Sequence, residues 1–243
     1  MPRYAMVTDL RKCVGCEACT VACNAEWSVP AGFARTHVRQ TPIAGTFPNL
    51  TSGFHVAQCN QCDRPPCADA CPSGATSQGA DGIVRVDKDL CIGCAFCVAA
   101  CPYDARYINP ATKKVDKCDF CLPRIERGEP PACVATCTSH AKYFGDLEDR
   151  SSEVFRLVYA EGAQRIETSS VAVGPNVYYL GKPESLALVA QSFPPRPPHL
   201  PAAGEFWRKA VRPLVLLAVG ATFLGQAAAF FTQLVKGEND FED

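Results

Sequence analysis

The placement of sixteen cysteines restricts the fold of this chain more than any other feature. All lie before residue 138 of the 243 residues and form four groups of four. This number is high for an intracellular enzyme and below the density of a small disulfide scaffold. The grouping predicts four metal sites. The groups are, in order, Cys13, Cys16, Cys19 and Cys23; Cys59, Cys62, Cys67 and Cys71; Cys91, Cys94, Cys97 and Cys101; and Cys118, Cys121, Cys133 and Cys137.

The spacing within the groups identifies the kind of metal site. Groups one and three have the spacing C-x2-C-x2-C-x3-C, group two has a wider middle gap, and group four has a loop inserted between Cys121 and Cys133. In the bacterial ferredoxin motif the fourth cysteine ligates the neighbouring cluster. Gly15 and Gly93 let backbone N–H groups approach the cluster sulfurs. We therefore expect four 4Fe-4S clusters, with no three-iron or Rieske-type centre, and folding that depends on metal binding.

Proline divides the groups into two kinds. Pro72 and Pro102 follow the last cysteine of groups two and three, whereas Asn24 and Thr138 follow it in groups one and four. Proline fixes the backbone where it leaves the site. This difference pairs group one with group four and group two with group three, as in a duplicated two-cluster ferredoxin.

Two other uses of the cysteines remain open at this stage. Disulfides need an oxidising compartment, and three cysteines within one turn are poorly placed to pair with one another. A zinc-organised interaction protein is the alternative from another functional class, because C-x2-C pairs also bind zinc, usually as two separated pairs. Iron content distinguishes the zinc protein from the iron-sulfur protein.

The remaining sequence predicts an α+β chain with four parts. Short strands are expected over residues 4–8, 53–57, 83–86 and 176–180, and a capped helix over residues 151–161. We expect a four-cluster ferredoxin-like domain over residues 1–150 and a packing extension over residues 151–191. A proline-rich linker over residues 192–203 and a C-terminal transmembrane helix with an acidic tail over residues 204–243 follow.

The transmembrane expectation rests on residues 214–235, which carry no formal charge over about the length of a bilayer core. An amphipathic helix buried in a soluble partner is the alternative. Arg208, Lys209 and Arg212 precede the segment and Lys236 follows it, which favours a cytoplasmic cluster domain. The N-terminus shows no export signal, in agreement with that face. Export together with a partner that carries a signal would give the periplasmic face instead.

Charge and motifs exclude several functional classes. The net charge of -1 and a pI near 6.4 give no reason to expect a nucleic-acid partner. The chain has no phosphate loop, nucleophile elbow or zinc-protease motif, so we expect no catalysis by this chain itself. We expect isolated histidines in structural or surface positions, at His37, His55, His140 and His199. Basic residues beside the cysteines either offset the cluster charge or form solvated loops; they are Arg11, Lys12, Lys113, Lys114, Lys117, Arg124 and Arg127.

Five stretches of the sequence resemble those of a known protein family. They are YAMVTDLRKCVGCEACTVAC from Tyr4, CPYDARY from Cys101, KCDFC from Lys117, PACVATC from Pro131 and FGDL from Phe144. They resemble the four-cluster iron-sulfur subunits of molybdopterin oxidoreductases related to dimethyl sulfoxide reductase. The resemblance is closest to the polysulfide, thiosulfate and tetrathionate reductase branch and covers residues 4–180.

The resemblance implies a set of ligands for each cluster, carried over at the matching cysteines. Each cluster takes three cysteines from one group and the last cysteine of the paired group. Cluster one takes Cys13, Cys16, Cys19 and Cys137; cluster two takes Cys59, Cys62, Cys67 and Cys101; cluster three takes Cys91, Cys94, Cys97 and Cys71; and cluster four takes Cys118, Cys121, Cys133 and Cys23.

The resemblance also implies a role. Such a subunit catalyses nothing and relays single electrons between a molybdenum- or tungsten-pterin catalytic subunit and a quinone-reactive membrane subunit. The branch implies anaerobic respiration of polysulfide, thiosulfate, tetrathionate or sulfite. However, the C-terminal helix is similar to that of the β subunits of membrane-bound formate dehydrogenase and of some nickel-iron hydrogenases. An electron-transfer subunit of one of those complexes is therefore the alternative.

Overall fold

The structure is a computed structural model that describes residues 2–167, 172–193 and 211–236. The chain divides into two compact units, residues 1–198 and 199–243, which we describe separately. Most of the expected linker, residues 192–203, lies outside the described residues; only Ser192 and Phe193 are within them.

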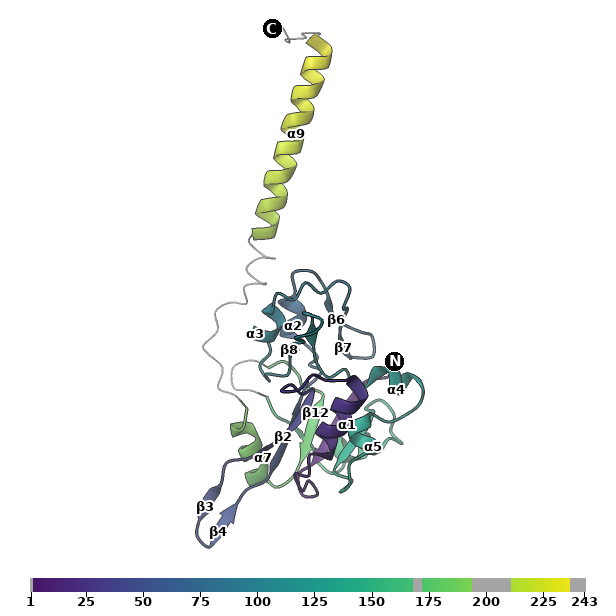
Figure 1. Ribbon diagram of the computed structural model, residues 1–243, viewed down its shortest axis with the longest axis vertical. Coiled ribbons are helices and arrows are strands. Elements are labelled where there is room, and N and C mark those ends of the chain that lie inside the picture. The colour runs from purple at the N-terminus through teal and green to yellow at the C-terminus, as the bar shows by residue number, and fades with distance from the viewer. Residues whose placement is uncertain (1, 168–171, 194–210, 237–243) are drawn as a thin grey trace. The chain divides into compact units, whose positions relative to one another are not determined.

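A mixed four-stranded sheet connects the two ends of the first unit (Figure 1). Its strands, in spatial order, are β10 (Lys142–Asp146), β1 (Tyr4–Asp9), β12 (Val177–Leu180) and β11 (Gln164–Arg165). β1 pairs antiparallel with β10 and parallel with β12. The strands predicted over residues 4–8 and 176–180 are confirmed. β11 and β12 lie in the expected packing extension, so that segment completes the sheet. β1 of the same sheet leads directly into the first cysteine group.

Both faces of β1 are buried, and they face different layers. Met6 packs into a cluster that includes cysteines, whereas Ala5 and Val7 pack with Val154 and Leu157 of α6 on the other side. Successive side chains of a strand point to opposite faces, so β1 separates these layers. One layer of the unit is an ordinary apolar core, and the other is built around cysteines.

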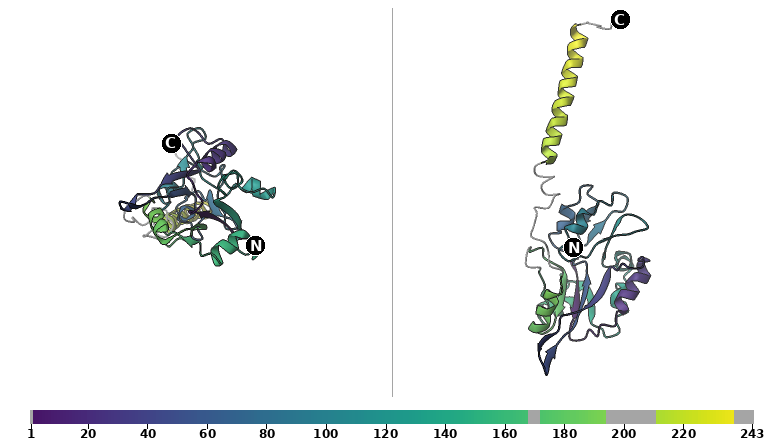
Figure 2. Two further views of the ribbon diagram at one scale, coloured as in Figure 1. Left: turned by 90° about the horizontal axis from the view of Figure 1, so that it is seen from below. Right: turned by 60° about the vertical axis from the view of Figure 1, so that its left-hand side comes forward.

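The other strands form two-stranded hairpins that carry the loops between cysteine groups. Their pairs are β2 (Thr36–Gln40) with β5 (Phe54–Gln58), β3 (Ala44–Thr46) with β4 (Asn49–Thr51), β6 (Thr76–Gln78) with β7 (Val84–Val86), and β8 (Tyr107–Ile108) with β9 (Val115–Asp116). The strands predicted over residues 53–57 and 83–86 are confirmed, with a shift of one residue at each start. Figures 1 and 2 show the β3–β4 hairpin extending away from the rest of the unit.

The helices of this unit are short. They are α1 (Ala18–Trp27), α2 (Pro66–Asp69), α3 (Phe96–Ala99), α4 (Leu122–Glu126), α5 (Ala132–Ala135), α6 (Glu153–Tyr159) and α7 (Pro183–Gln191). The predicted capped helix is α6, where the Ser152 hydroxyl accepts a hydrogen bond from the Phe155 amide at 3.2 Å. No sequence pattern predicted α7, which packs Leu186 and Val189 against the cysteine-containing layer.

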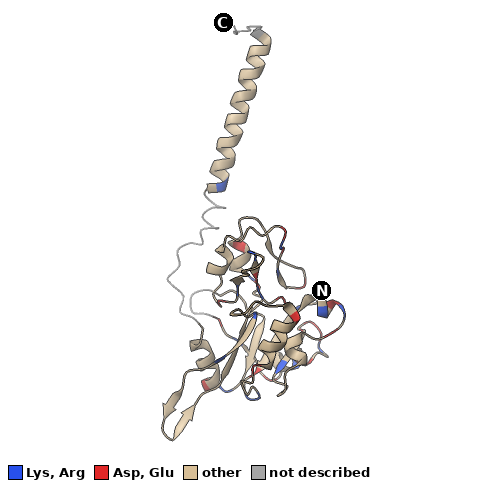
Figure 3. Cartoon of the chain, viewed as in Figure 1, with Lys and Arg blue, Asp and Glu red and all other residues tan. Residues whose placement is uncertain are grey.

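The described part of the second unit, residues 211–236, contains one long helix, α9 (Arg212–Lys236). Its stretch from Arg212 to Val235 is long and apolar enough to cross a membrane. Figure 3 shows this helix coloured blue at its first turn and tan along the rest of its described length. The helix predicted over residues 214–235 is therefore confirmed, with two further residues before it and one after.

Candidate metal centres

Groups one and three form the same backbone turn. Gly15 and Gly93 have φ angles of 69° and 70°, and two residues further on Glu17 and Ala95 are also left-handed. A Cβ on Gly15 would overlap the Phe54 ring, so only glycine fits there. The turn places the third cysteine of each group at the start of a helix, α1 or α3.

Packing between the short helices brings the groups together in pairs. α1 carries the end of group one and packs against α5, which carries the third cysteine of group four. α2 carries the third cysteine of group two and packs against α3 of group three. Figures 1 and 2 show these two helix pairs in different regions of the unit. Groups one and four thus share one region, and groups two and three share the other.

In the first region, cysteines that are distant in the sequence become neighbours. Burial raises the pKa of Cys13, and the nearby Cys137 raises it further. Burial also raises the pKa of Cys23 to about 12, with added repulsion from Cys133 and Cys121. The last cysteine of each group therefore lies beside cysteines of the paired group.

The second region repeats this arrangement. Burial raises the pKa of Cys62, and the nearby Cys59, Cys101 and Cys67 raise it further. Cys101, the last cysteine of group three, therefore lies among group two. The last cysteine of group two lies in an apolar cluster with cysteines of group three; the cysteines of that cluster are Cys67, Cys71, Cys91 and Cys97.

Burial makes these sites unsuitable for free thiolates. All sixteen cysteines are unpaired; only Cys16 is exposed, and ten are buried. Several sulfurs accept hydrogen bonds. Trp27 Nε1 donates to Cys121 Sγ at 3.3 Å, and the Arg106 guanidinium donates to Cys67 Sγ at 2.8 Å. Buried sulfurs that accept hydrogen bonds and lie beside other cysteines fit metal-bound thiolates, because the metal supplies the compensating charge.

The arrangement of the cysteine side chains bears on which metal they can bind. Within residues 2–167, 172–193 and 211–236, no three His, Cys, Asp or Glu side chains lie close enough together to hold one metal ion. A tetrahedral zinc site draws four sulfurs to about 2.3 Å from one ion. A 4Fe-4S cluster, in contrast, is held by four thiolates at its separate irons. The sixteen unpaired cysteines, gathered in two regions, supply the four thiolates that each of four such clusters needs.

Three buried cations near the cysteines were not anticipated from the sequence. Of the seven basic residues singled out beside the cysteines, only Lys117 is buried. Arg35, Arg106 and Lys142 are also buried, each at most 7% exposed. Their burial depends on packing between segments far apart in the chain, and proximity in sequence does not reveal it.

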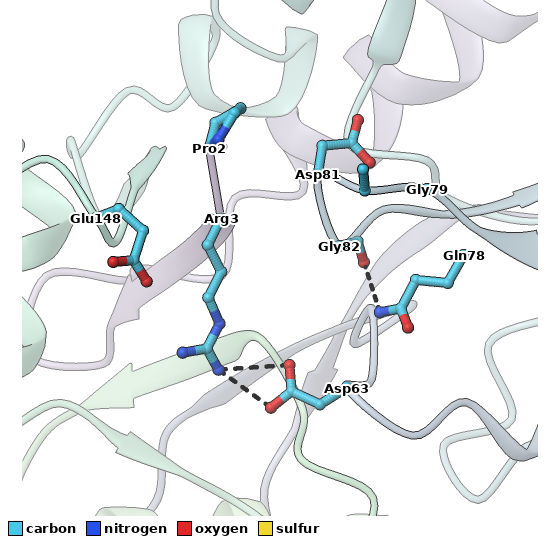
Figure 4. A pocket seen from close by; sticks show the side chains of 9 residues that line it. Pro2, Arg3, Asp63, Gln78, Gly79, Asp81, Gly82 and Glu148 are labelled. Carbon is cyan, nitrogen blue, oxygen red and sulfur yellow. Dashed lines mark hydrogen bonds and ion pairs between the residues drawn. The ribbon is translucent and has the colours of Figure 1, made fainter.

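Among the described residues, those outside the cysteine groups show no comparable chemistry. A surface cavity of about 530 Å³ is lined by Arg3, Asp63, Gln78 and Glu148 among others and contains no cysteine. Figure 4 shows Arg3 reaching across it to Asp63, 3.1 Å away. His55 is fully buried between Tyr179 and Ser192, and burial lowers its pKa to about 3. It is a neutral structural residue, as expected.

Comparison with known proteins agrees with this geometry. Residues 50–147 match the family model of the 4Fe-4S dicluster domain. The chain is 44% identical over 181 residues to the tetrathionate reductase B subunit of Salmonella typhimurium, covering 74% of this chain and 72% of the relative. It is 41% identical to the B polypeptide of polysulfide reductase from Wolinella succinogenes, covering 69% and 88%. It is 44% identical to the thiosulfate reductase electron transfer subunit PhsB of Salmonella typhi, covering 64% and 81%.

This protein belongs to the family of four-cluster iron-sulfur subunits that its motifs resemble. It is an electron-transfer protein that holds four 4Fe-4S clusters, so the expected cofactors and ferredoxin-like fold are confirmed. Its relatives are subunits of reductase complexes. This agrees with a non-catalytic role in which partner subunits carry out the catalysis.

Proposed function

We propose that this chain relays single electrons between a molybdenum- or tungsten-pterin catalytic subunit and a quinone-reactive membrane subunit. The substrate class is a sulfur compound: polysulfide, thiosulfate, tetrathionate or sulfite. The names of three relatives support this class, because they are reductases of tetrathionate, polysulfide and thiosulfate. The observation that carries the relay is the packing of cysteines from all four groups into two adjoining regions of one unit.

The proposal includes the crossed ligand sets given above. Clusters one and four are supported by the packing of α1 on α5 and by the proximity of Cys137 to Cys13 and of Cys23 to Cys133. Clusters two and three are supported by the packing of α2 on α3 and by the position of Cys101 among group two. In each region, the last cysteine of each group is a ligand of the paired group's cluster.

Contacts between ligand sets support a linear order for the relay. Cys19 of cluster one lies near Cys133 of cluster four. Cys118 of cluster four lies near Cys59 of cluster two. Cys67 of cluster two shares an apolar cluster with Cys97 and its neighbours in cluster three. The order is therefore one, four, two, three, with clusters one and three at the ends.

Both ends of this order reach the surface. At cluster one, Cys16 is exposed, and Val14 and Val21 beside it are 60% and 67% exposed. At cluster three, Ile92 and Phe96 are 67% and 47% exposed. The two interior clusters have mostly buried ligands. Exposed apolar side chains at the two ends suit contact with electron donor and acceptor subunits.

The protein's contribution to the relay is to hold the ligands in place and to control their surroundings. Each cluster, when bound, takes up and releases one electron. The buried sheet and hairpins exclude water from the interior ligands, and Trp27 and Arg106 donate hydrogen bonds to the sulfurs of Cys121 and Cys67. Such donors stabilise negative charge on sulfur and set the redox potential.

Metal analysis of the complex tests the proposal. We expect the chain, purified anaerobically with its native partners, to carry about sixteen irons together with molybdenum or tungsten. Low-temperature EPR after dithionite reduction should show interacting 4Fe-4S signals. Nickel in place of molybdenum or tungsten would assign the chain to a hydrogenase, and zinc without iron would exclude the relay.

Membrane attachment through α9 is a separate part of the proposal. We expect the variant Leu224→Arg/Ala228→Arg to leave the membrane fraction after an alkaline wash. Each arginine near the centre of the helix costs about 2.5–3.5 kcal/mol of insertion free energy. The control, Val215→Arg/Val235→Arg, places the same charges near the helix ends, where long side chains reach the interface, and should remain bound. Equal retention of both variants would contradict anchoring by this helix.

A further inference from the structure

Lys142 is a buried cation in the region of groups one and four. It is 4% exposed, and its Nζ donates to Gln58 Oε1 at 2.7 Å. Within the described part of the chain, it forms no ion pair with a carboxylate. Its charged neighbours are cysteines of both groups: Cys133, Cys19, Cys118 and Cys23. Burying a lone ammonium is costly, so its negative counterpart must come from the cluster ligands.

Arg106 occupies the corresponding place in the region of groups two and three. It is 4% exposed; its Nη2 donates to Cys67 Sγ at 2.8 Å and its Nη1 to Thr76 Oγ1 at 3.2 Å. Its charged neighbours are cysteines of both groups: Cys67, Cys59, Cys97 and Cys101. No carboxylate among the described residues pairs with it.

The other two buried cations differ in their partners. The Arg35 guanidinium pairs with the Asp116 carboxylate at 2.7 Å, so its charge is neutralised within the protein. Lys117 Nζ donates to the main-chain carbonyls of Val84 and Cys118. Among the described residues, Arg106 donates directly to a cysteine sulfur, and Lys142, held by Gln58, has cysteines as its charged neighbours; neither pairs with a carboxylate.

Their positions in the sequence match. Arg106 lies five residues after Cys101, and Lys142 lies five residues after Cys137. Those cysteines are the last of groups three and four, and each is the cysteine exchanged into the paired group's ligand set. The duplicated fold therefore places one cation at the same position of each half, where two clusters adjoin.

We propose that Arg106 and Lys142 raise the reduction potentials of the clusters they adjoin, Arg106 at clusters two and three and Lys142 at clusters one and four. The inference rests on the proposed relay and its ligand sets. Reduction adds one electron, and hence one negative charge, to a cluster whose thiolate ligands are already anionic. A buried unit of positive charge a few ångströms away stabilises the reduced state more than the oxidised state. Both are positioning residues that act through the clusters.

Redox titration of the assembled complex, followed by EPR, tests this inference. We expect Arg106→Gln and Lys142→Gln each to lower the reduction equilibrium constant of an adjoining cluster about tenfold or more. This is a fall in potential of about 59 mV for a one-electron couple. Arg106→Gln should shift the potentials of clusters two and three only, and Lys142→Gln those of clusters one and four only. Arg106→Lys and Lys142→Arg keep the charge and should stay close to the unaltered protein.

Two further variants make the test specific to charge. Gln58→Glu places a carboxylate beside Lys142 with almost no change in shape, and should lower the same potentials as Lys142→Gln while leaving the lysine in place. Lys12→Gln removes an exposed positive charge next to Cys13 in the sequence. Because solvent screens that charge, the potentials should be unchanged. Gln58→Glu also keeps the inference testable if Lys142→Gln fails to assemble its clusters.

The outcomes separate this inference from the proposed relay. Unchanged potentials in Arg106→Gln, Lys142→Gln and Gln58→Glu, with about sixteen irons retained, would overturn the inference and leave the relay intact. Equal shifts in the charge-conserving and glutamine variants would show that packing acts, not charge, and would also overturn it. Absence of iron from the unaltered protein would reject the relay itself.

Discussion

Removal of iron is expected to abolish the cooperative unfolding transition of the first unit. The apolar cluster that contains Met6 and Phe120 has twelve buried residues, of which four are cysteines. In the cluster around Val84, three of six buried residues are cysteines. Without iron and sulfide, these side chains surround empty space, and nearby cations such as Lys142 lose their counter-charge. The loss should exceed the usual stability of a domain, about 5–15 kcal/mol.

The size of this effect follows from what remains without the clusters. The layer built from Ala5, Val7, Leu147, Val154 and their neighbours contains no cysteine. It covers only one face of the central sheet. The other face carries Met6, Val177 and Tyr179, and a sheet with that apolar face uncovered is not expected to stay folded. Folding of the rest therefore depends on metal binding, as in other small metal-centred domains.

Circular dichroism measures this directly. Anaerobic chelation should remove most far-UV strand signal and the near-UV signal of buried aromatic residues such as Tyr179, and urea should then give no sigmoidal transition. A parallel sample incubated without chelator controls for handling, and reconstitution with iron and sulfide should restore the transition. An iron-free protein that unfolds cooperatively at an unchanged urea midpoint would contradict the prediction.

The short-range features of the fold were predictable because local sequence determines them. The turn at Gly15 and Gly93 and the cap at Ser152 each depend on a few adjacent residues. The cysteine spacing predicted the metal type, and the pairing predicted from the two Cys-Pro sequences agrees with the packing of α1 on α5 and of α2 on α3. Local pattern also predicted α9, since an uncharged stretch of that length has few alternatives.

The features that were missed depend on contacts between distant segments. Lys142 is buried because β10 pairs with β1, more than a hundred residues earlier, and because Gln58 approaches from a third segment. The sequence around it, SHAKYFGD, is typical of an exposed loop leading into a strand. Arg106 was missed for the same reason, although its offset from the preceding cysteine is that of Lys142. The signal available in the sequence was that each of these two cations lies five residues after the last cysteine of its group.

Loss of Cys101 is expected to destroy a cluster that belongs mainly to group two, although Cys101 is part of group three. If the crossed ligand sets are correct, Cys62→Ala/Cys101→Ala removes two ligands from the same cluster. The complex should then retain three intact clusters and about twelve irons. Cys94→Ala/Cys101→Ala instead removes one ligand from each of two clusters, so two EPR signals should change. In both variants electron transfer to the acceptor subunit should fall to background, because a linear relay is interrupted.

The comparison of the two double variants decides the assignment, because each removes two cysteines. Ligands of one cluster act as a unit, so Cys62→Ala adds little damage once Cys101 is gone, whereas Cys94→Ala adds a second lesion. Asp104→Asn, an exposed change three residues after Cys101, is the control and should keep all four signals. If Cys94→Ala/Cys101→Ala lost one cluster and Cys62→Ala/Cys101→Ala altered two, each group would bind its own cluster. The exchange of cysteines between paired groups would then be wrong, even with the same total of iron in the unaltered protein.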